Sequence, residues 1–337
     1  MSVTLRPGRD EDAAAFIGIV SACWSEYPGC VTDIDGEAPE LRALASAMAA
    51  KSGAVWAAEA DGDVIGLCAA WPHDARTWEV GKMYVAASHR GQGAARALLD
   101  AAEAHARSAG ANEMRLFSDT RFDRAHAFYE KSSYVRAGAL RALADKSNSI
   151  EFGYTKPLTG VVVRPLDVAA LGSAEALLAT ILKTCVDAGA AVSFLAPLAL
   201  SEARAFWHRA GSAVAGGRRI VLAAWVDGAL VGTVTVDCDT PQNQPHRADV
   251  AKLLVHPEVR RHGVARALMT AAEQAAASQG RTLLTLDTRA ADAGEALYRA
   301  MGWSYAGTIP GYAVDAAGVP HDTLLFYKRL GSGGSAT

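Results

Sequence analysis

The chain has 337 residues, half of them apolar and a fifth charged, with a formal net charge of −3. This length is long for one domain and sufficient for two, and the composition is ordinary for a globular protein. The charge gives no electrostatic support for binding nucleic acid, and stretches such as AFIGIV fall short of the ~20 apolar residues of a membrane span. We therefore expect neither nucleic acid nor a membrane as a partner.

Cysteine and histidine usage bears on the compartment and on metal binding. The five cysteines form an odd set without a CxxC pair, and the histidines do not stand at zinc-ligand spacings. The N-terminal stretch has acidic residues where a signal peptide would have its apolar core. We predict reduced thiols, no metal site and a cytoplasmic location; a Cys23–Cys30 disulfide is the less favoured alternative.

In chain order, the first half mixes strand and helix patterns. VWAAEA and DVIGLCAAW flank an Asp-Gly pair, which predicts a β-hairpin, and TWEVGKMYV predicts a further strand. The apolar spacing of 95–110 predicts a helix that ends at Gly110, a residue suited to the position after a helix C-cap. EMRLFSDT then predicts a strand and DRAHAFYEK a helix. The fold class is therefore mixed α/β.

The second half repeats the first. VWAAEADGDVIG returns as VLAAWVDGALVG, and EVGKMYV returns as DVAKLLV. Gly93 returns as Gly263, 170 positions later, and the downstream segment FYEKSSY returns as LYRAMGW. Because these segments recur in the same order, we interpret the chain as a tandem duplication. We predict an N-terminal domain at 1–156, a linker at 157–160 within TKPLTG, a C-terminal domain at 161–330 and a flexible tail at 331–337.

Each copy carries Arg-x-x-Gly-x-Ala between a strand and a long helix, first at Arg90, Gly93 and Ala95. The first turn of a helix has backbone N–H groups without intrahelical partners and a partial positive charge, and small residues let an anion approach them. A P-loop is excluded because no Lys-Ser or Lys-Thr follows the glycines. A dinucleotide-binding fold is disfavoured because there is no GxGxxG with an acidic residue about 20 positions further on. The motif predicts a pyrophosphate site; a turn that serves only packing is the alternative, which the duplication disfavours.

Both halves resemble GCN5-related N-acetyltransferase (GNAT) domains, whose signature Q/R-x-x-G-x-G/A binds the pyrophosphate of acetyl-CoA. The resemblance covers roughly 3–156 and 161–330. It implies a bent mixed sheet flanked by helices, two splayed central strands that hold the pantetheine, and acetyl-CoA as acyl donor. It assigns the coenzyme to Met83, Tyr84, Val85, Arg90, Gly91, Gln92, Gly93, Ala94, Ala95 and Arg96 in the first half, and to Leu253, Leu254, Val255, Arg260, Arg261, His262, Gly263, Val264, Ala265 and Arg266 in the second.

The second half also resembles a narrower group. PHRADVAKLLVHPEVRRHGVARALM and IPGYAVDAAGVPHDTLLFYKRL are similar to the tabtoxin-resistance acetyltransferases, which acetylate an amine-bearing β-lactam toxin. The size and layout of the whole chain look similar to a tandem acetyltransferase of clavulanic acid biosynthesis. The implied acceptor is the amine of a small molecule, such as an antibiotic, a toxin or a biosynthetic intermediate. We expect the segments 25–40 and 186–201 to form the acceptor walls.

Acetyl transfer to an amine needs a base for the ammonium, a group that polarises the carbonyl, and a proton for the departing thiolate. The resemblance implies that Asp249 and Asp287 are the catalytic carboxylates and that Tyr298 donates the proton to the thiolate. Since Asp249 replaces a glutamate, a water-relayed base is favoured over direct contact. The corresponding residues of the first half are Glu79, Asp119 and Tyr129.

Several alternatives stay open. The aspartates could instead be helix caps or ion-pair partners, and the tyrosines could only pack their rings. Only one half, with the C-terminal half favoured, could be catalytic while the other binds coenzyme as a structural or sensing module, or the acceptor could be a protein. We expect the linked halves to pack as an intramolecular pseudo-dimer, in a monomer or a homodimer. Ser133 departs from the family pattern, which has glycine there, as the second half does at Gly302.

Overall fold

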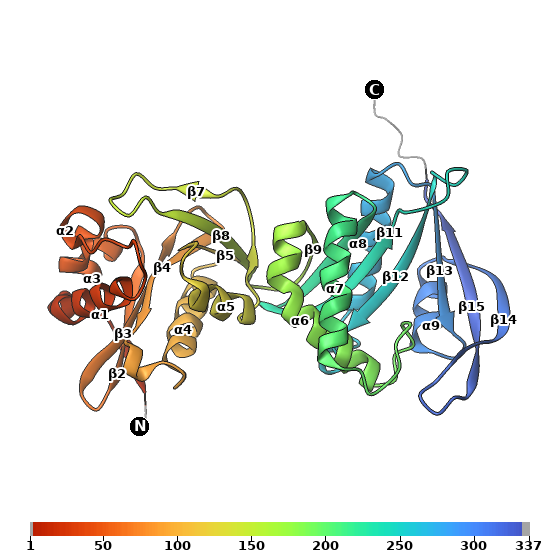
Figure 1. Cartoon of the computed structure of the whole chain (residues 1–337), viewed down its shortest axis with the longest axis horizontal. Coiled ribbons are helices and arrows are strands. Elements are labelled where there is room, and N and C mark those ends of the chain that lie inside the picture. Colours follow the sequence, from red (N-terminus) through yellow and green to blue (C-terminus); the bar gives the residue numbers. More distant parts are fainter. Residues whose placement is uncertain (1–2, 332–337) are drawn as a thin grey trace. The chain divides into compact units, whose positions relative to one another are not determined.

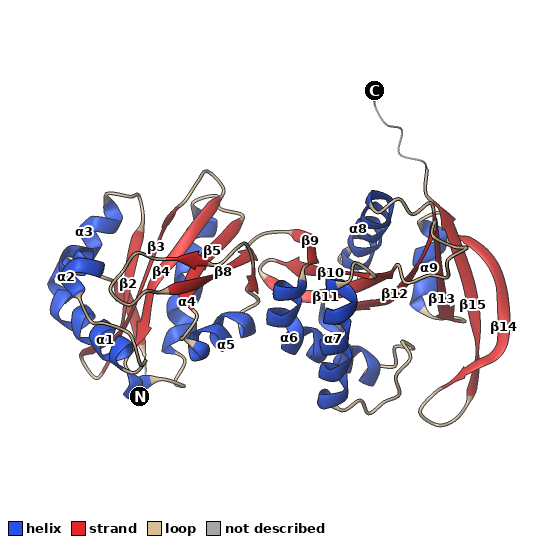
Figure 2. Ribbon diagram, turned by 45° about the horizontal axis from the view of Figure 1, so that its top comes forward, coloured by secondary structure: helices blue, strands red, loops and turns tan. Residues whose placement is uncertain are grey.

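The computed structural model describes residues 3–331, which divide into two compact units, Met1–Thr159 and Gly160–Thr337 (Figure 1). We call them unit 1 and unit 2. Apart from Gly331, the predicted flexible tail lies outside the described residues. Each unit is a mixed sheet with helices on both faces, so the predicted fold class is confirmed (Figure 2).

The sheet of unit 1 is antiparallel except at its centre. Its order is β1-β2-β3-β4-β5-β8-β6, with β7 also paired to β8, and only β4 and β5 run parallel. β4 and β5 can be parallel because helix α4 makes the crossover between them. The strands are β1 Thr4–Pro7, β2 Ala54–Ala60, β3 Asp63–Pro72, β4 Thr77–Val85, β5 Glu113–Asp119, β6 Val135–Arg136, β7 Arg141–Ala142 and β8 Ile150–Pro157.

The helices of unit 1 form two cores, one on each face of the sheet. Leu98 and Leu99 of α4 pack with Tyr129 of α5 on one face, whereas Phe16 of α1 and Leu44 of α3 pack on the other. Figure 2 shows α1–α3 together on that second side of the sheet. The helices are α1 Ala13–Ser25, α2 Ile34–Glu37, α3 Leu44–Ala49, α4 Ala94–Ser108 and α5 Asp123–Lys131, with 3₁₀ turns at Asp10–Asp12, Pro39–Ala43 and Ala87–His89.

Unit 2 has the same plan with different outer parts. Its sheet order is β14-β15-β13-β12-β11-β10-β9, and only β12 and β13 run parallel. Leu268 of α8 packs with Tyr298 of α9 on one face. The elements are β9 Val161–Leu166, α6 Val168–Asp187, α7 Leu200–Ala215, β10 Arg219–Val226, β11 Ala229–Asp237, β12 Arg247–Val255, a 3₁₀ turn Pro257–Val259, α8 Val264–Ser278, β13 Leu283–Arg289, α9 Ala293–Ala300, β14 Ser304–Val314 and β15 Pro320–Arg329.

Local turn chemistry sets the boundaries of these elements. Asp61 and Gly62 both have positive φ, 52° and 92°, as the predicted Asp-Gly hairpin requires. Gly110, with φ of 87°, follows the end of α4, and the next N–H donates to the carbonyl of Ala106 at 2.9 Å. This bond closes the helix in a Schellman arrangement, which confirms the predicted helix end.

One helix of the described part, α6, is long and apolar enough to cross a membrane on length and composition alone. Half of the window that passes this test is buried inside unit 2, as in the core helix of a folded domain, so the observation is weak evidence for a membrane span. The uninterrupted apolar runs of this helix stay short, as expected, because polar and charged residues occur within 168–187; the absence of a membrane partner stays a prediction.

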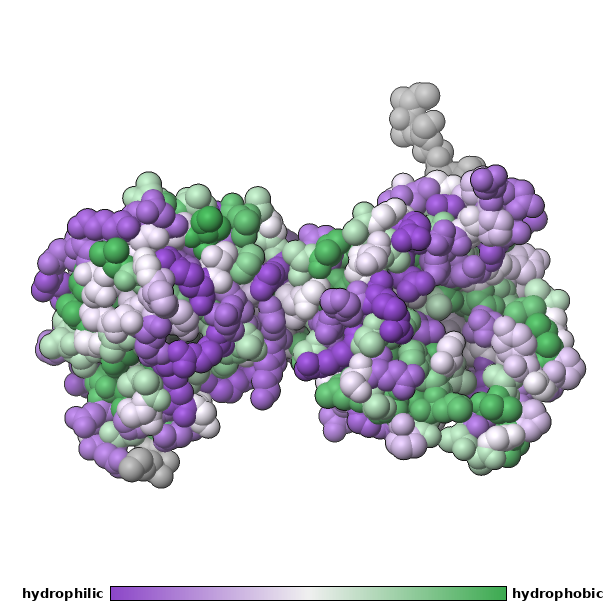
Figure 3. Space-filling model, in the orientation of Figure 1, coloured by the Kyte–Doolittle hydropathy of each residue, from purple (hydrophilic) through white to green (hydrophobic). Residues whose placement is uncertain are grey.

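The two sheets differ at the edge that follows β15 in unit 2 and β8 in unit 1. β14 is the edge strand, and nearly all of its residues are exposed, including Tyr305, Ile309 and Tyr312. Figure 3 shows hydrophobic surface at the right-hand border of this unit, where Figure 1 draws β14 (Figure 3). In unit 1 the corresponding edge is formed by the two-residue strands β6 and β7.

Candidate functional site

The central strands of each unit separate partway along their length. β4 pairs with β5 only from Thr77 to Glu79, after which β5 continues beside β8 alone. In unit 2, β12 pairs with β13 only as far as Asp249. The predicted splay is therefore present twice. Beyond Glu79 and Asp249, the edge of β4 or β12 that faced the parallel neighbour has no strand partner within residues 3–331. Met83–Val85 and Leu253–Val255 lie in this free segment.

A bulge lies just beyond the point of separation. Lys82 and Lys252 both have φ of 52°, and the register of the neighbouring antiparallel pair shifts beside each of them. A bulge adds a residue to one strand and bends it, which increases the local separation. Both lysines therefore lie where β4 or β12 turns away from its parallel neighbour.

The glycine loops have the same backbone in both units. Gly91 and Gly93 have φ of 75° and 90°, and Arg261 and Gly263 have φ of 69° and 80°. A Cβ added to any of the three glycines would meet nothing within 4 Å, so backbone conformation and not packing favours glycine at these positions. The exposed residues 91–93 and 261–263 precede the unpaired N–H groups of α4 and α8. This open, electropositive helix start fits a diphosphate.

The first arginine of each motif makes internal contacts. Arg90 donates from Nε to the carbonyl of Val85 at 3.0 Å, forms two 2.7 Å bonds with Glu26 and contacts the sulfur of Cys23. Arg260 donates to the carbonyl of Val255 at 3.3 Å. Both guanidinium groups therefore join the end of the free strand to the glycine loop. Of the other predicted loop residues, Gln92, Arg96, His262 and Arg266 are exposed, Ala94 and Val264 are buried, and Ala95 and Ala265 are half-buried.

The acidic residue at the point of separation is ion-paired in both units. Glu79 accepts two bonds from Arg115, the shorter at 2.6 Å. Asp249 accepts bonds from Arg247 and from the hydroxyl of Thr285. A carboxylate held in this way can still accept a proton through water, but it also performs the ion-pair role that the sequence left open.

Asp119 and Asp287, which occupy the same position in β5 and β13, have different surroundings. Asp119 is buried and accepts bonds from the backbone N–H and the Nε of Arg121, at 2.9 and 2.8 Å. Burial alone would raise its pKa, but the hydrogen bonds from Arg121 and Ser149 outweigh it and hold the pKa below the ordinary value. Asp287 is exposed. Its charge acts on the neighbouring Lys252 and Tyr298.

Tyr129 and Tyr298 are each 7% exposed and lie on α5 and α9, beside the opening between the strands. Burial raises the pKa of both phenols well above the ordinary value. Neither hydroxyl has a hydrogen-bond partner among residues 3–331. Each hydroxyl therefore keeps its proton at neutral pH and can donate it to a bound molecule, as a general acid must.

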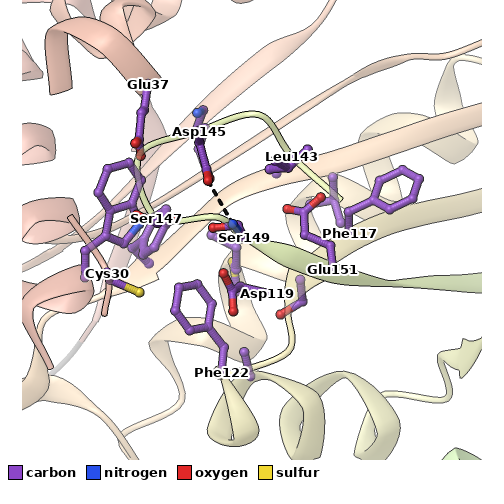
Figure 4. Close-up of a pocket in the computed structure, with 18 of the residues that line it drawn as sticks. Cys30, Glu37, Phe117, Asp119, Phe122, Leu143, Asp145, Ser147, Ser149 and Glu151 are labelled. Atoms are coloured by element: carbon purple, nitrogen blue, oxygen red, sulfur yellow. Dashed lines mark hydrogen bonds between the residues drawn. The ribbon is translucent and has the colours of Figure 1, made fainter. Parts of the chain in front are cut away.

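A cavity of about 450 Å³ lies at the separated strands of unit 1 (Figure 4). Its walls include Gly81–Tyr84 of β4, Phe117–Asp119 of β5, Glu37 of α2, and Ser147 and Ser149 of the β7–β8 loop. Tyr129 also lines it, although α5 packs on the opposite face of the sheet. The cavity therefore reaches through the gap between β4 and β5, and the segment 25–40 contributes to it.

Sequence reasoning did not identify several residues of this region. Lys82 and Lys252 occupy the same position in EVGKMYV and DVAKLLV, so the repeat itself contains the signal for them. In unit 2, Lys252 lies 5.8 and 5.6 Å from the ring centres of Phe194 and Phe206. The β7–β8 loop of unit 1, with Asp145, has no counterpart motif in the second half that could have drawn attention to it.

The chain is similar to known proteins. One similar solved structure is a ribosomal-protein-alanine N-acetyltransferase from Brucella melitensis, with 23% sequence identity over 50% of this chain and 99% of that one and a TM-score of 0.43. An N-acetyltransferase from Staphylococcus aureus Mu50 has 17% identity over 51% of this chain and 99% of that one, with a TM-score of 0.43. A phosphinothricin acetyltransferase from Sinorhizobium meliloti in complex with AcCoA has 20% identity over 53% of this chain and 93% of that one, with a TM-score of 0.44. The profile of the Acetyltransferase (GNAT) family matches residues 17–134 and 194–303, one segment in each unit and together more than half of the chain. The chain therefore belongs to the GNAT acetyltransferase family.

Proposed function

We propose that the chain transfers an acetyl group from acetyl-CoA to the amine of a small molecule, and that both units bind the coenzyme. The proposal depends on one observation, the duplicated loop in which two left-handed residues precede a helix start at the end of a bulged, unpaired strand. Acetyl-CoA is the acyl donor; its thioester supplies the acetyl group, so the transfer breaks a C–S bond, forms an N–C bond and moves a proton from the amine to the thiol.

The residues of the chain have separate roles in this transfer. The loops at 91–93 and 261–263 and the first turns of α4 and α8 hold the diphosphate through backbone N–H groups. The free edges at Met83–Val85 and Leu253–Val255 offer backbone groups to the pantetheine amides, much as a neighbouring strand would. Arg90 and Arg260 keep the strand end and the loop in register.

Proton transfer falls to the side chains at the opening. Tyr129 and Tyr298 protonate the sulfur, since their hydroxyls carry a proton and have no hydrogen-bond partner within residues 3–331. Glu79 and Asp249 receive the proton of the ammonium through water. The likeness of the second half to tabtoxin-resistance enzymes, and of the layout to a tandem acetyltransferase of clavulanic acid biosynthesis, supports an antibiotic, a toxin or a biosynthetic intermediate as acceptor.

Two measurements test the proposal. Mass spectrometry of candidate amines incubated with the chain and acetyl-CoA should detect a product heavier by one acetyl group. Calorimetry should count two coenzyme sites per chain, one in the Gly93→Val or Gly263→Val variant and none in the double variant, because valine cannot adopt the required positive φ without strain. Unchanged stoichiometry in these variants, or no acetylated product from any amine, would contradict the proposal.

A further inference from the structure

Part of the cavity of unit 1 lies on the side of the sheet opposite to α4. Its upper walls are Glu37 of α2 and the β7–β8 loop, on the face that α1 covers. The loop at 91–93 begins α4, which packs on the other face. A donor held by the loop and an acceptor in the cavity would therefore meet at the gap between the strands, where Tyr129 lies.

Most charges around this cavity cancel in pairs. Asp119 is bound by Arg121, and Glu151 is bound by Arg141 at 2.6 Å. Lys82, which also lines the cavity, is bound by Glu40 at 2.7 Å. These pairs leave two lining carboxylates, those of Glu37 and Asp145.

Glu37 and Asp145 accept only backbone hydrogen bonds. Glu37 accepts from the N–H of Lys146 at 2.9 Å, and Asp145 accepts from the N–H of Ser149 at 2.8 Å. Within residues 3–331 neither carboxylate forms an ion pair, and the side chain of the nearby Lys146 is bound to Asp33. Figure 4 shows both side chains on the upper wall of the cavity, above Asp119.

The charge of these carboxylates acts on a neighbouring thiol as well as on Lys146 and Arg121. The pKa of Cys30, which lines the same cavity, is raised by burial and, against the opposing effect of Arg121, by Asp119, Asp145 and Glu37. The three carboxylates therefore act on one region of space. Such a region favours a cation, because two unpaired negative charges in a partly enclosed cavity repel each other.

Tyr129 supplies the second indication of a ligand. The residue is 7% exposed and lines this cavity, and its hydroxyl has no hydrogen-bond partner in the described part of the chain. A hydroxyl that lines a cavity without a protein partner can form its hydrogen bonds with a ligand or with water. The cavity thus has an unfilled polar group at its floor and two unpaired carboxylates at its upper wall.

We propose that unit 1 acetylates an acceptor with at least two amino groups: one reacts beside Tyr129, and a second, as an ammonium, is held by Glu37 and Asp145. This inference rests on the proposed function, since it identifies the acceptor of that site. The reacting amine has to lose its proton to attack, whereas the distal ammonium keeps its charge and orients the molecule. Monoamines and zwitterionic amino acids lack the second interaction and are poorer acceptors.

The test compares the full chain with Glu37→Gln and Asp145→Asn. Both substitutions remove the charge and keep the oxygen that accepts the backbone bond, so the fold is retained. Asp35→Asn is the matched control, because Asp35 lies on the same helix, is exposed and pairs with Arg42 at 2.7 Å outside the cavity. The acceptors are α,ω-diamines from 1,3-diaminopropane to 1,6-diaminohexane, each paired with the n-alkylamine of equal length.

We expect kcat/KM for the preferred diamine to fall by about tenfold to a hundredfold in each cavity variant, the range for hydrogen bonds to charged groups. The monoamine rate and the control variant should stay within about twofold of the unmodified chain. Equal rates for diamines and monoamines, or a diamine preference that survives both substitutions, would overturn the inference.

Calorimetric titration of 1,6-diaminohexane without coenzyme separates this inference from the proposed function. Diamine binding that weakens in both cavity variants supports the cation site even if no amine is acetylated, in which case only the proposed function fails. Acetylation of amines without charge-dependent diamine binding overturns the cation site and leaves the proposed function intact.

Discussion

The two units are nearly identical on the face that carries the glycine loop and different on the other. α4 and α8 both have 15 residues, and the ten positions from 91 and from 261 have the same sequence of exposed and buried residues. On the opposite face, unit 1 has the 13-residue α1 and two short helices, whereas unit 2 has α6 and α7 with 20 and 16 residues. Under the proposed function, the similar face is the one that holds the donor, and the divergent face is the one that meets the acceptor.

The same contrast appears at the opening between the strands. Lys82 is neutralised by Glu40, and Asp119 is neutralised by Arg121. Lys252 instead lies over aromatic rings, and Asp287 is exposed. One unit therefore presents unpaired carboxylates to its cavity, and the other presents a lysine among aromatic side chains. This difference predicts two acceptors and not one.

The largest expected effect comes from the buried tyrosines. With a diamine acceptor, Tyr129→Phe should lower kcat by at least about a hundredfold, the lower range for a lost general acid, whereas Tyr298→Phe should change it by less than about twofold. Because burial raises the pKa of both hydroxyls above their ordinary value near 10, neither should produce an alkaline loss of rate below that pH. Steady-state rates from pH 6 to 10 provide the measurement.

The pair of variants also tests whether the halves are independent. Equal losses in Tyr129→Phe and Tyr298→Phe with the same acceptor would show that the units do not have separate acceptors. A loss confined to Tyr298→Phe would assign the diamine to unit 2.

An ion pair that is buried in unit 1 and half-buried in unit 2 gives the second largest effect. Glu103 and Lys156 are 2% and 4% exposed and lie 2.7 Å apart, with the hydroxyl of Tyr134 also bound to Glu103. Glu273 and Lys328 are 16% and 23% exposed at the same 2.7 Å. Glu103→Gln should lower the free energy of unfolding by about 3 kcal/mol, since it leaves a buried ammonium without its counter-charge.

Glu273→Gln is the matched control for that substitution. Lys328 retains the carbonyl of Met301 at 2.8 Å and remains partly solvated, so the expected loss is about 1 kcal/mol. Urea denaturation followed by circular dichroism measures both variants. Equal losses would mean that depth of burial does not determine how much each ion pair contributes to the free energy of unfolding.

Much of the fold follows from local sequence signals, and much of the site does not. Asp61-Gly62, Gly110 and the glycines of the loop each specify a turn through their own backbone preferences, so the hairpin, the helix end and the loop are predictable. The contact of Arg90 with Glu26 joins residues 64 positions apart, and the cavity gathers Glu37 and Asp145 from opposite ends of unit 1. Such groupings depend on tertiary packing, which no local pattern encodes.

A smaller effect concerns the arginine in the first turn of each long helix. Arg96 is bound to Asp100 at 2.9 Å, whereas Arg266 has Thr270 at that position and forms no ion pair within the described ranges. We expect Arg266→Gln to weaken coenzyme binding in unit 2 by about fivefold and Arg96→Gln to weaken it in unit 1 by about twofold, because a paired guanidinium attracts an anion less.

Calorimetry in the Gly93→Val and Gly263→Val backgrounds isolates each unit for this comparison. Asp100→Thr should bring unit 1 closer to unit 2, with higher affinity and a steeper dependence on salt concentration. No change in Asp100→Thr would show that Arg96 does not reach the coenzyme.

The smallest effect tests the one position at which the first half departs from the family pattern. Ser133 and Gly302 both have positive φ, 70° and 78°, and follow the tyrosine helix in the same way: the next residue donates back to Tyr129 or Tyr298 at 3.1 or 3.0 Å. The serine thus leaves the turn unaltered but strained. Gly302→Ser has free space for its side chain and should lower the free energy of unfolding by about 1 kcal/mol through backbone strain alone, with acetylation rates unchanged. Thermal denaturation measures the loss of stability. A loss of several kcal/mol, or a fall in the acetylation rate, would mean that the turn at Gly302 positions Tyr298 more strictly than the turn at Ser133 positions Tyr129.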